Sequence, residues 1–252
     1  MLGNSLKNKK IIISAGASGI GWATTKICVA KGALVYLCDV DPKAINKVKK
    51  HPLYNKRIFV SETEASDETE VIDFFHKIKK KFRNLDALIN NVGVAGPTGT
   101  IEKLDSREWE NTLHVNVNSH FYFTKQAIPL LKKSKTSSII NISSGAGIMG
   151  FPLRSPYAAS KWAVIGMTKT LAMELGKYNI RVNTVCPTFV VTPMTKKFLK
   201  DKKFKRDMLS SIPLGRFAEM SEISSAVVFL ASDAASMITG TSLLVDGGWT
   251  AR

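Results

Sequence analysis

The chain has 252 residues, 44% of them hydrophobic and 22% charged, which is the composition of an ordinary globular protein and excludes a disordered, collagen-like or disulfide-stapled one. Lys and Arg outnumber Asp and Glu by 36 to 20, giving a formal net charge of +16. The basic residues are spread along the chain without the interleaved aromatic side chains of a single-strand binding groove. We therefore expect a lysine-rich solvated surface and no nucleic-acid partner.

The sequence holds no run of the roughly 18 consecutive apolar residues that a bilayer core demands, and residues 1–10 are polar and basic. We expect neither a membrane span nor a secretory signal. Cys28, Cys38 and Cys186 are widely separated, which predicts no CxxC pair and no metal site. Unpaired cysteines of this kind are typical of a reducing compartment, so we expect a cytoplasmic protein.

Short runs rich in Ile, Val and Leu alternate with longer stretches of helical periodicity, which predicts an α/β fold built from strand-helix units. The predicted strands are 10–14, 34–38, 57–60, 87–90, 138–142, 181–185 and 242–245. The predicted helices are 20–30, 67–81, 106–131, 158–175 and 221–230. Because the strands are apolar on both faces, we expect a seven-stranded parallel sheet with helices on both sides.

We find no linker that would divide the chain, so residues 1–252 are expected to form a single dinucleotide-binding and catalytic domain. A basic segment, 192–213, is bracketed by Pro193 and Pro213 and is predicted to be an irregular, substrate-binding insertion. It contains the densest cluster of lysines in the chain, between Lys196 and Arg206.

A glycine-rich turn follows the first strand and runs into the first helix. Glycines let the backbone approach a pyrophosphate, and the amides of a helix start favour an anion. The residues of this turn that we assign to a cofactor are Ser14, Gly16, Ser18, Gly19, Ile20 and Gly21. Tight turns also use glycine for conformational reasons alone, so the turn needs its context.

The second strand is followed by Asp39, about twenty residues after the turn, where a carboxylate can bind the hydroxyls of an adenosine ribose and repel a 2′-phosphate. NAD is therefore expected rather than NADP, although Lys43 lies close by in the sequence. The alternative for Asp39 is a carboxylate that only caps a turn.

Tyr157 and Lys161 are four residues apart in a helical pattern, so their side chains share one face. A nearby ammonium stabilises a phenolate and moves the tyrosine toward exchanging a proton with an alcohol. Ser144, after the fifth strand, is placed to hold the substrate oxygen. The alternative is an ordinary pair on a helix surface.

Taken together, these motifs resemble the short-chain dehydrogenase/reductase family over essentially the whole chain. The markers are the glycine turn at 14–21, Asn90-Asn91-Val92-Gly93, Asn116, Ser144, Tyr157 with Lys161, Pro187 with Thr192, and Val245-Asp246-Gly247-Gly248. The resemblance implies a Rossmann-type, doubly wound sheet and a homotetramer in which helices 106–131 and 158–175 pack between subunits and the segment around Trp249 forms another interface.

The resemblance also implies the roles of individual residues. Tyr157 is the acid/base, Lys161 lowers its pKa and holds the nicotinamide ribose, Ser144 orients the substrate oxygen, and Asn116 completes a proton relay. An alternative for Asn116 is a buried side chain that only bonds the backbone. The remaining residues expected at the cofactor are Glu64, Ala65, Asn90, Asn91, Val92, Gly93, Pro187, Val190 and Thr192.

The sequence departs from the family pattern at four places. Ala15 replaces a glycine and is tolerated if its φ angle is negative, Val92 replaces an alanine, Thr188 replaces a glycine, and Glu64 stands where an aspartate is usual near the adenine. None removes a group that the chemistry needs.

The substrate pocket is expected to involve Met149 and Phe151, with Leu153 and Phe198 as further apolar candidates. Arg154 lies three residues before Tyr157 and could bind an anionic substrate group, aided by the lysines at 196–206. The alternative is that Arg154 pairs with a protein carboxylate and that the lysines form a solvated helix face.

The sequence thus predicts an NAD-dependent oxidoreductase that transfers a hydride between nicotinamide and a secondary alcohol or ketone, with a polyol, sugar acid or small hydroxy acid as substrate. One alternative is a 3-oxoacyl carrier-protein reductase that uses NADPH, which Asp39 disfavours. Another is a catalytically idle dinucleotide-binding scaffold, which the intact Ser144, Tyr157 and Lys161 disfavour.

Overall fold

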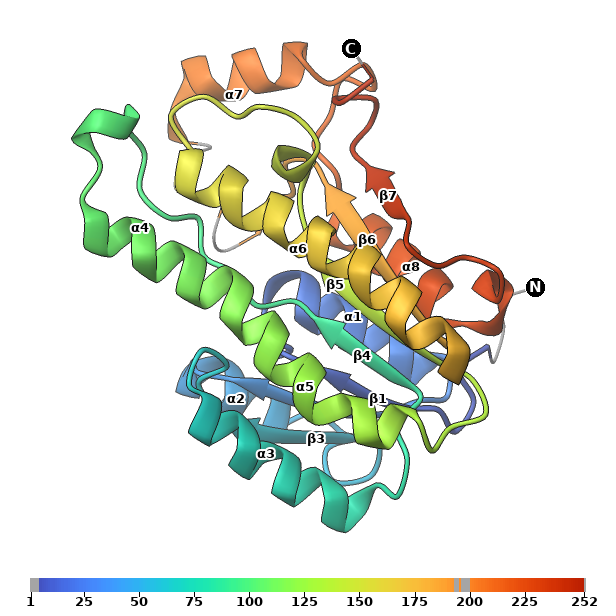
Figure 1. The fold of residues 1–252 in the computed structure, drawn as a ribbon. Helices are drawn as coiled ribbons and strands as arrows, with labels where there is room; N and C mark the ends of the chain where they lie inside the picture. Colours follow the sequence, from blue (N-terminus) through green and yellow to red (C-terminus); the bar gives the residue numbers. More distant parts are fainter. Residues whose placement is uncertain (1–4, 193–194, 196–199, 252) are drawn as a thin grey trace.

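The computed structural model describes residues 5–192, 195 and 200–251. Its strands form one parallel sheet of seven strands in the order β3-β2-β1-β4-β5-β6-β7 (Figure 1). The strands are β1 (Lys10–Ile13), β2 (Leu34–Asp39), β3 (Ile58–Glu62), β4 (Ala87–Asn90), β5 (Ser137–Ile142), β6 (Ile180–Pro187) and β7 (Ser242–Val245). The α/β class, the doubly wound sheet and all seven strands are therefore confirmed.

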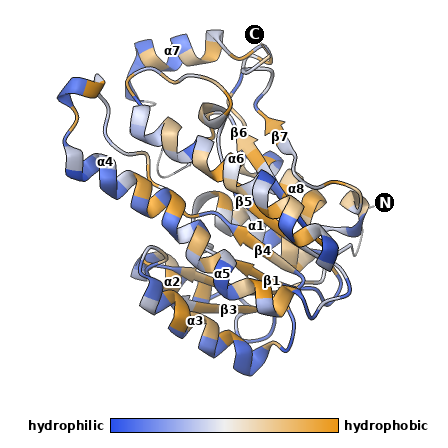
Figure 2. Ribbon diagram, viewed as in Figure 1, coloured by the Kyte–Doolittle hydropathy of each residue, from blue (hydrophilic) through white to orange (hydrophobic). Residues whose placement is uncertain are grey.

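Helices cover both faces of the sheet (Figure 1). One face carries α1 (Gly19–Ala30), α2 (Pro42–Lys49) and α8 (Met220–Ala231), and the other carries α3 (Glu68–Lys81), α5 (Ser119–Leu131) and α6 (Ser155–Leu175). Successive strand residues alternate between the two layers: Ile11 and Ile13 are buried against the first set of helices and Ile12 against the second. This explains why the strands are apolar on both faces. In Figure 2 the ribbons of strands such as β1 and β3 are orange, the colour of hydrophobic residues.

The predicted helix 106–131 is one continuous rod built from three segments. It begins as α4 (Ser106–Leu113), where the Asp105 carboxylate accepts hydrogen bonds from the amides of Arg107 and Glu108. A π-helical segment, His114–Asn118, follows and leads into α5. The wider π turn shifts the helix register at Asn116, a device that often marks functional sites.

Two helices were not predicted from the periodicity. They are α2, and α7 (Lys202–Ser210), which lies within the segment expected to be irregular. Each begins after an aspartate whose carboxylate accepts amide hydrogen bonds of the first turn: Asp41 from Lys43, and Asp201 from Lys203 and Phe204. The expectation of an irregular 192–213 is therefore wrong for 202–210. Lys196, Lys197 and Phe198 lie outside the described residues.

Among the described residues, no helix is long and apolar enough to cross a membrane, and no group of three or more His, Cys, Asp or Glu side chains could hold a metal ion. The three cysteines are buried and free.

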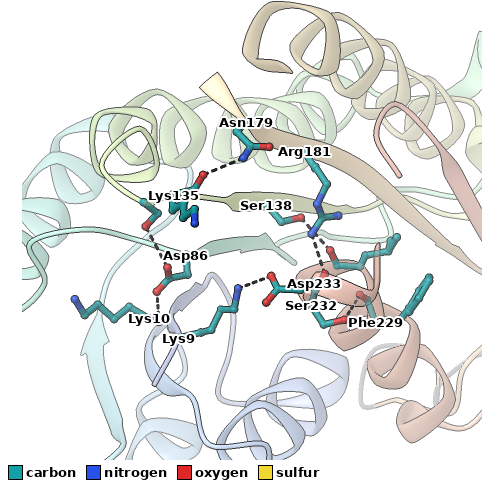
Figure 3. A network of polar contacts seen from close by, with 12 residues as sticks. Lys9, Lys10, Asp86, Lys135, Ser138, Asn179, Arg181, Phe229, Ser232 and Asp233 are labelled. Atoms are coloured by element: carbon teal, nitrogen blue, oxygen red, sulfur yellow. Dashed lines mark hydrogen bonds and ion pairs between the residues drawn. The ribbon is translucent and has the colours of Figure 1, made fainter. Parts of the chain in front are cut away.

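A polar network joins the amino ends of the strands (Figure 3). The Asp86 carboxylate accepts hydrogen bonds from the backbone amide of Lys10, at 2.8 Å, and from the hydroxyl of Ser134, at 3.1 Å. Beside it, Lys9 forms a 2.7 Å ion pair with Asp233, and the Arg181 guanidinium donates to the carbonyl oxygen of Ser232. The network fastens β1, β4 and β6 to the end of α8 without taking any part in the groove at the opposite edge.

Replacing Asp86 with alanine should destabilise the protein by about 1–3 kcal/mol, because it leaves the half-buried amide of Lys10 without its acceptor. Asp233→Ala is the matched control. It removes an ion pair whose carboxylate is 71% exposed and should cost less than about 1 kcal/mol. Denaturant unfolding measures both, and equal losses in the two variants would contradict this interpretation.

Candidate active site

A groove opens along the carboxyl ends of β1, β4, β5 and β6, where parallel sheets of this kind bind ligands. It encloses about 890 Å³ of empty space, solvent-open parts included. The strand order reverses between β1 and β4, so the loops after these two strands diverge to opposite faces and leave the groove between them. Its lining residues are Ala15, Ser18, Gly19, Ile20, Asn91, Gly93, Ile142, Ser143, Ser144, Tyr157, Lys161, Pro187, Thr188, Val190, Thr192 and Thr195.

The glycine turn is packed too tightly for side chains at its key positions. A Cβ on Gly16 would lie 2.7 Å from the Cβ of Leu37, and one on Gly21 would collide with the carbonyl oxygen of Ala15. Gly19 opens α1 with a φ of +52°, and the Ser18 side chain, within the described structure, caps no amide of the first turn. These amides and the positive end of the helix dipole therefore face the groove and fit a pyrophosphate.

At Ala15 the structure corrects an expectation. Its φ is +49°, not negative, so the backbone of Ala15 is in the left-handed region that favours glycine. The turn keeps this shape because its neighbours hold it: the amide of Gly16 donates to the carbonyl oxygen of Cys38, and the Asn91 side-chain amide donates to the carbonyl oxygen of Ala15 at 2.9 Å. Ala15 is thus a strained position in the wall of the groove.

Asp39 is 7% exposed at the end of β2, beside the glycine turn. One of its carboxylate oxygens accepts a hydrogen bond from the amide of Ala17 at 3.0 Å, and the other accepts from the amides of Val40 and Asp41. The carboxylate therefore both ties the turn to β2 and puts a negative charge next to it. Capping the turn and binding an adenosine ribose are therefore compatible roles for Asp39.

The segment after β4 is held against the groove from behind. The backbone amide of Asn91 donates to the hydroxyl of Ser14 at 3.1 Å. Val92 is buried, and its carbonyl oxygen lies 3.2 Å from Nε2 of His120. Burial and the nearby Lys161 lower the pKa of His120 to about 3, so this imidazole is neutral. His120 was not predicted, since only its place one turn after Asn116 points to it.

Asn116 is fully buried in the π-helical segment. Its side-chain amide donates to the carbonyl oxygen of Val94 and to the hydroxyl of Ser160, and its oxygen accepts from the Val94 amide at 2.7 Å. These bonds fix the groove segment next to Gly93. The side chain has the backbone-bonding role that the sequence left open, and a relay role is a proposal.

Ser144, Tyr157 and Lys161 come together at the inner end of the groove. The Ser144 oxygen accepts a hydrogen bond from the amide of Ala146 at 3.1 Å, which leaves its proton to be donated, and its hydroxyl bonds the phenol of Tyr157. The Lys161 ammonium donates to the carbonyl oxygen of Ile142 at 3.0 Å and lies 5.7 Å from the centre of the Tyr157 ring.

Burial governs the ionisation of this set. It lowers the pKa of Lys161 to about 8, and it raises the pKa of Tyr157 above its ordinary value. The hydrogen bond from Ser144 and the charge of Arg154 act in the opposite direction on Tyr157. Desolvation outweighs the attraction of these protein groups for the phenolate, so the net shift is upward. The role of Lys161 in stabilising the phenolate stays a prediction.

Next to Tyr157 the groove continues into a smaller pocket. Four of its nine lining residues are aromatic, and Phe151 packs edge-on against Trp249 with ring centres 5.7 Å apart. The lining residues are Ala95, Ser144, Phe151, Arg154, Tyr157, Thr188, Phe189, Thr195 and Trp249. Trp249, expected at a subunit interface, is only 4% exposed within this chain and forms part of the pocket.

Other predicted residues lie outside these linings. Met149 packs against the cluster of Met208, Ile212 and Trp249, and the Glu64 carboxylate accepts hydrogen bonds from the backbone and side chain of Ser66. Ala65 is buried in the core layer that contains α3, and the side-chain amide of Asn90 donates to the side-chain oxygen of Asn141 at 2.8 Å.

Thr188 and Thr195 were not singled out as site residues, yet both line the groove and the pocket. The Thr188 hydroxyl is buried and has no hydrogen-bond partner within the described residues. The signal for Thr188 was its departure from the usual glycine after Pro187, which puts a side chain where the two cavities meet.

Comparisons with known proteins agree with this geometry. A family model described as enoyl-(acyl carrier protein) reductase matches residues 14–250. A trans-4-hydroxycyclohexanecarboxylate dehydrogenase of Sinomonas cyclohexanicum is 39% identical, with 96% of this chain and 93% of that protein covered. The 3-oxoacyl-[acyl-carrier-protein] reductase FabG of Thermotoga maritima is 37% identical, with coverages of 96% and 98%. The crystal structure of levodione reductase superposes with a TM-score of 0.92 at 29% identity, covering 98% of this chain and 99% of that one.

The chain belongs to the short-chain dehydrogenase/reductase family. It is an oxidoreductase that acts on CH–OH groups or the matching carbonyls, and the family binds nicotinamide dinucleotides.

Replacing Ala15 with glycine should raise the free energy of unfolding by about 0.5–1 kcal/mol, because the left-handed strain is removed at the cost of some unfolded-state entropy. We expect dinucleotide affinity to rise modestly as well. Chemical denaturation and a binding titration check the two effects. Gly16→Ala is the control and should destabilise the protein, and a loss of stability in Ala15→Gly would contradict the assignment of strain.

Lys161→Met should stabilise the folded protein by about 2 kcal/mol at pH 7 while abolishing turnover, because the buried ammonium costs about 3 kcal/mol and its bond to Ile142 returns only part of that. The folded pKa is near 8 and the ordinary value is 10.5, so this cost is complete below pH 8 and vanishes as the pH rises to 10.5. Unfolding curves at pH 7 and pH 10 measure the gap between variant and wild type. The gap should narrow at pH 10, and a variant less stable than wild type at pH 7 would overturn the argument.

Proposed function

We propose that the protein is an NAD-dependent dehydrogenase that oxidises a small secondary alcohol, or reduces the matching ketone, with Tyr157 as acid/base. The observation that carries the proposal is the position of Ser144 and Tyr157, which line both the long groove and the aromatic pocket. A hydroxyl in the pocket can then contact both side chains while a dinucleotide occupies the groove.

A bound nicotinamide supplies the hydride acceptor or donor next to the reacting carbon. The protein groups handle the proton. Ser144 donates to the substrate oxygen, Tyr157 removes the hydroxyl proton during oxidation or returns it during reduction, and Lys161 stabilises the charge on the phenolate. The amides at the start of α1 hold the pyrophosphate, and Val190 and Thr192 border the nicotinamide end.

The substrate class we favour among polyols, sugar acids and small hydroxy acids is the last. Aromatic walls suit a compact carbon skeleton better than a chain of hydroxyl groups, each of which would need a partner. Arg154 in the same pocket offers a positive charge to an anionic group, and its bonds to the Thr98 hydroxyl and the Ala95 carbonyl oxygen hold it there. The Sinomonas relative is named for a hydroxy acid, which agrees with this class.

A second candidate is a 3-oxoacyl carrier-protein reductase that uses NADPH. The name of the Thermotoga relative favours it. So does α7, whose exposed basic side chains, Lys202, Lys205 and Arg206, could attract an acidic carrier. The negative charge of Asp39 beside the glycine turn argues against a 2′-phosphate and so against this candidate.

We also propose that the protein is a cytoplasmic homotetramer, as the family resemblance implies. Large apolar side chains on α5 and α6 support a covered face in the assembly: Phe121 is 48% exposed, Trp162 50% and Met173 87%.

The proposed activity is tested by mixing the protein with NAD or NADP and a panel of hydroxy acids, polyols, sugar acids and 3-hydroxyacyl thioesters while following the absorbance of reduced nicotinamide. We expect turnover of a hydroxy acid with NAD, and a loss of at least about a hundredfold in Tyr157→Phe, which removes the proton-transfer group. Turnover confined to thioesters with NADP would instead establish the second candidate. Dinucleotide binding without turnover of any compound would favour the idle scaffold.

Cofactor preference is tested separately with Asp39→Asn, which removes the charge and keeps the shape of the side chain. We expect the ratio of kcat/KM for NAD over NADP to fall by about tenfold, since about 1.4 kcal/mol of repulsion toward the 2′-phosphate is lost. Asp41→Asn, on the neighbouring turn, is the control and should leave the ratio unchanged. An unchanged ratio in Asp39→Asn would mean that Asp39 serves only the turn.

A further inference from the structure

Tyr157 has two cations at nearly the same distance. The Lys161 ammonium lies 5.7 Å from the centre of its ring, and the guanidinium carbon of Arg154 lies 5.8 Å from it. The two charges approach from different cavities, since Lys161 lines the long groove and Arg154 lines the aromatic pocket. Only Lys161 belongs to the motif by which the sequence pointed to the site.

Arg154 is held in place by residues 95–98, in the segment that follows β4. Its guanidinium donates to the Thr98 hydroxyl at 2.7 Å and to the carbonyl oxygen of Ala95 at 2.6 Å. The preceding residue, Leu153, has a φ of +63° and accepts a hydrogen bond from the amide of Gly99 at 3.0 Å. A leucine adopts this backbone conformation only where its surroundings impose it, so the turn fixes where Arg154 enters the pocket.

The groups that face Tyr157 come from four parts of the fold. Ser144 lies after β5, Arg154 lies before α6, Lys161 lies on α6 and the Cys186 thiol lies on β6. Ser144 and Arg154 lower the pKa of Tyr157, while burial and Cys186 raise it. Behind Lys161, His120 is neutral and so brings no further charge at neutral pH.

We propose that Arg154 is a positioning residue of the catalytic site, a second cation that stabilises the phenolate form of Tyr157 from the substrate pocket. Opposite charges separated by several ångströms in a partly buried site interact strongly enough to change an ionisation equilibrium by about tenfold or more. Burial alone keeps Tyr157 protonated, and a guanidinium that never loses its proton counteracts it over the whole working pH range.

This inference deepens the proposed function and rests on it only for the role of Tyr157. A carboxylate bound to Arg154 would cancel part of its field, so the charge effect must be measured without an anionic substrate. Binding of a substrate anion and stabilisation of the phenolate then give different results.

The primary test is the ultraviolet titration of Tyr157 in the full chain with saturating NAD, which needs no turnover. The phenolate absorbance of wild type, Arg154→Gln and Arg154→Lys is followed against pH, and the curve of each protein carrying Tyr157→Phe is subtracted. The matched control is Arg181→Gln, which removes a comparably buried guanidinium bonded to Ser232 at the opposite edge of the sheet.

We expect the Tyr157 inflection to move upward by about one pH unit in Arg154→Gln, because a stabilising positive charge is lost. Arg154→Lys should recover most of the shift, and Arg181→Gln should titrate like wild type. Superimposable curves for wild type and Arg154→Gln overturn the proposal, as does an equal shift in Arg181→Gln. If Arg154→Gln does not fold, Thr98→Val replaces it, since it loosens Arg154 and keeps the charge; a smaller upward shift supports the proposal and an unchanged curve overturns it.

A kinetic arm uses a neutral probe, cyclohexanol, and the pH dependence of kcat/KM. The acid limb should move upward in Arg154→Gln by the same amount as the titration. A higher KM for hydroxy acids alone, with an unshifted titration, would leave Arg154 as an anion-binding residue only and overturn the proposal. A shifted titration without turnover of any alcohol would instead refute the proposed substrate class and keep the inference.

Discussion

The reacting end of the groove is arranged around one buried ammonium group. Lys161 is 4% exposed, and among the residues that the structure describes its ammonium donates one hydrogen bond, to the carbonyl oxygen of Ile142. Its own carbonyl oxygen accepts a hydrogen bond from Ser143, which ties α6 to the loop after β5. There is no room for bulk here: a Cβ on Gly147 would crowd the Lys161 carbonyl, and one on Gly93 would lie 3.2 Å from the ammonium nitrogen.

Much of this architecture could be predicted from the sequence, because its hydrophobic patterns are compatible with one arrangement of strands and helices. Apolar runs flanked by helical periods require a parallel sheet covered on both faces, and all seven strands lie within a few residues of where they were expected. Tyr157 and Lys161 share a helix face because they are four residues apart. The two missed helices are only 8 and 9 residues long and bury few side chains, and their capping aspartates, Asp41 and Asp201, identify them.

The sequence could not predict quantities that arise only from three-dimensional packing. The positive φ of Ala15 results from bonds made by Asn91 and by the backbone of β2, neither of which is adjacent in the chain. The raised pKa of Tyr157 reflects its partial burial by groups from several parts of the fold, and the contribution of Arg154 depends on a turn at Leu153 that no local pattern requires. Met149 and Glu64 were assigned from their position along the chain. Met149 packs in the cluster around Trp249 and Glu64 accepts hydrogen bonds from Ser66, and their roles toward substrate and cofactor stay predictions. The predicted strands and most of the predicted helices were confirmed, because they follow from local sequence patterns. The environment of an individual loop side chain depends on neighbours that are far away in the sequence.

The polar network at the amino ends of the strands (Figure 3) stabilises the sheet with residues that take no part in the proposed pocket. Asp86 and Arg181 tie the sheet together at the amino ends of the strands, while the pocket proposed for the substrate lies toward their carboxyl ends. Changes in the pocket walls therefore act on a sheet whose strand ends are already secured some distance away. In a scaffold of this kind, pocket residues such as Phe151, Arg154 and Thr188 can change in small evolutionary steps. Their substitution leaves the hydrogen bonds at the amino ends of the strands intact. The same separation makes the pocket a favourable place for engineering a new substrate range.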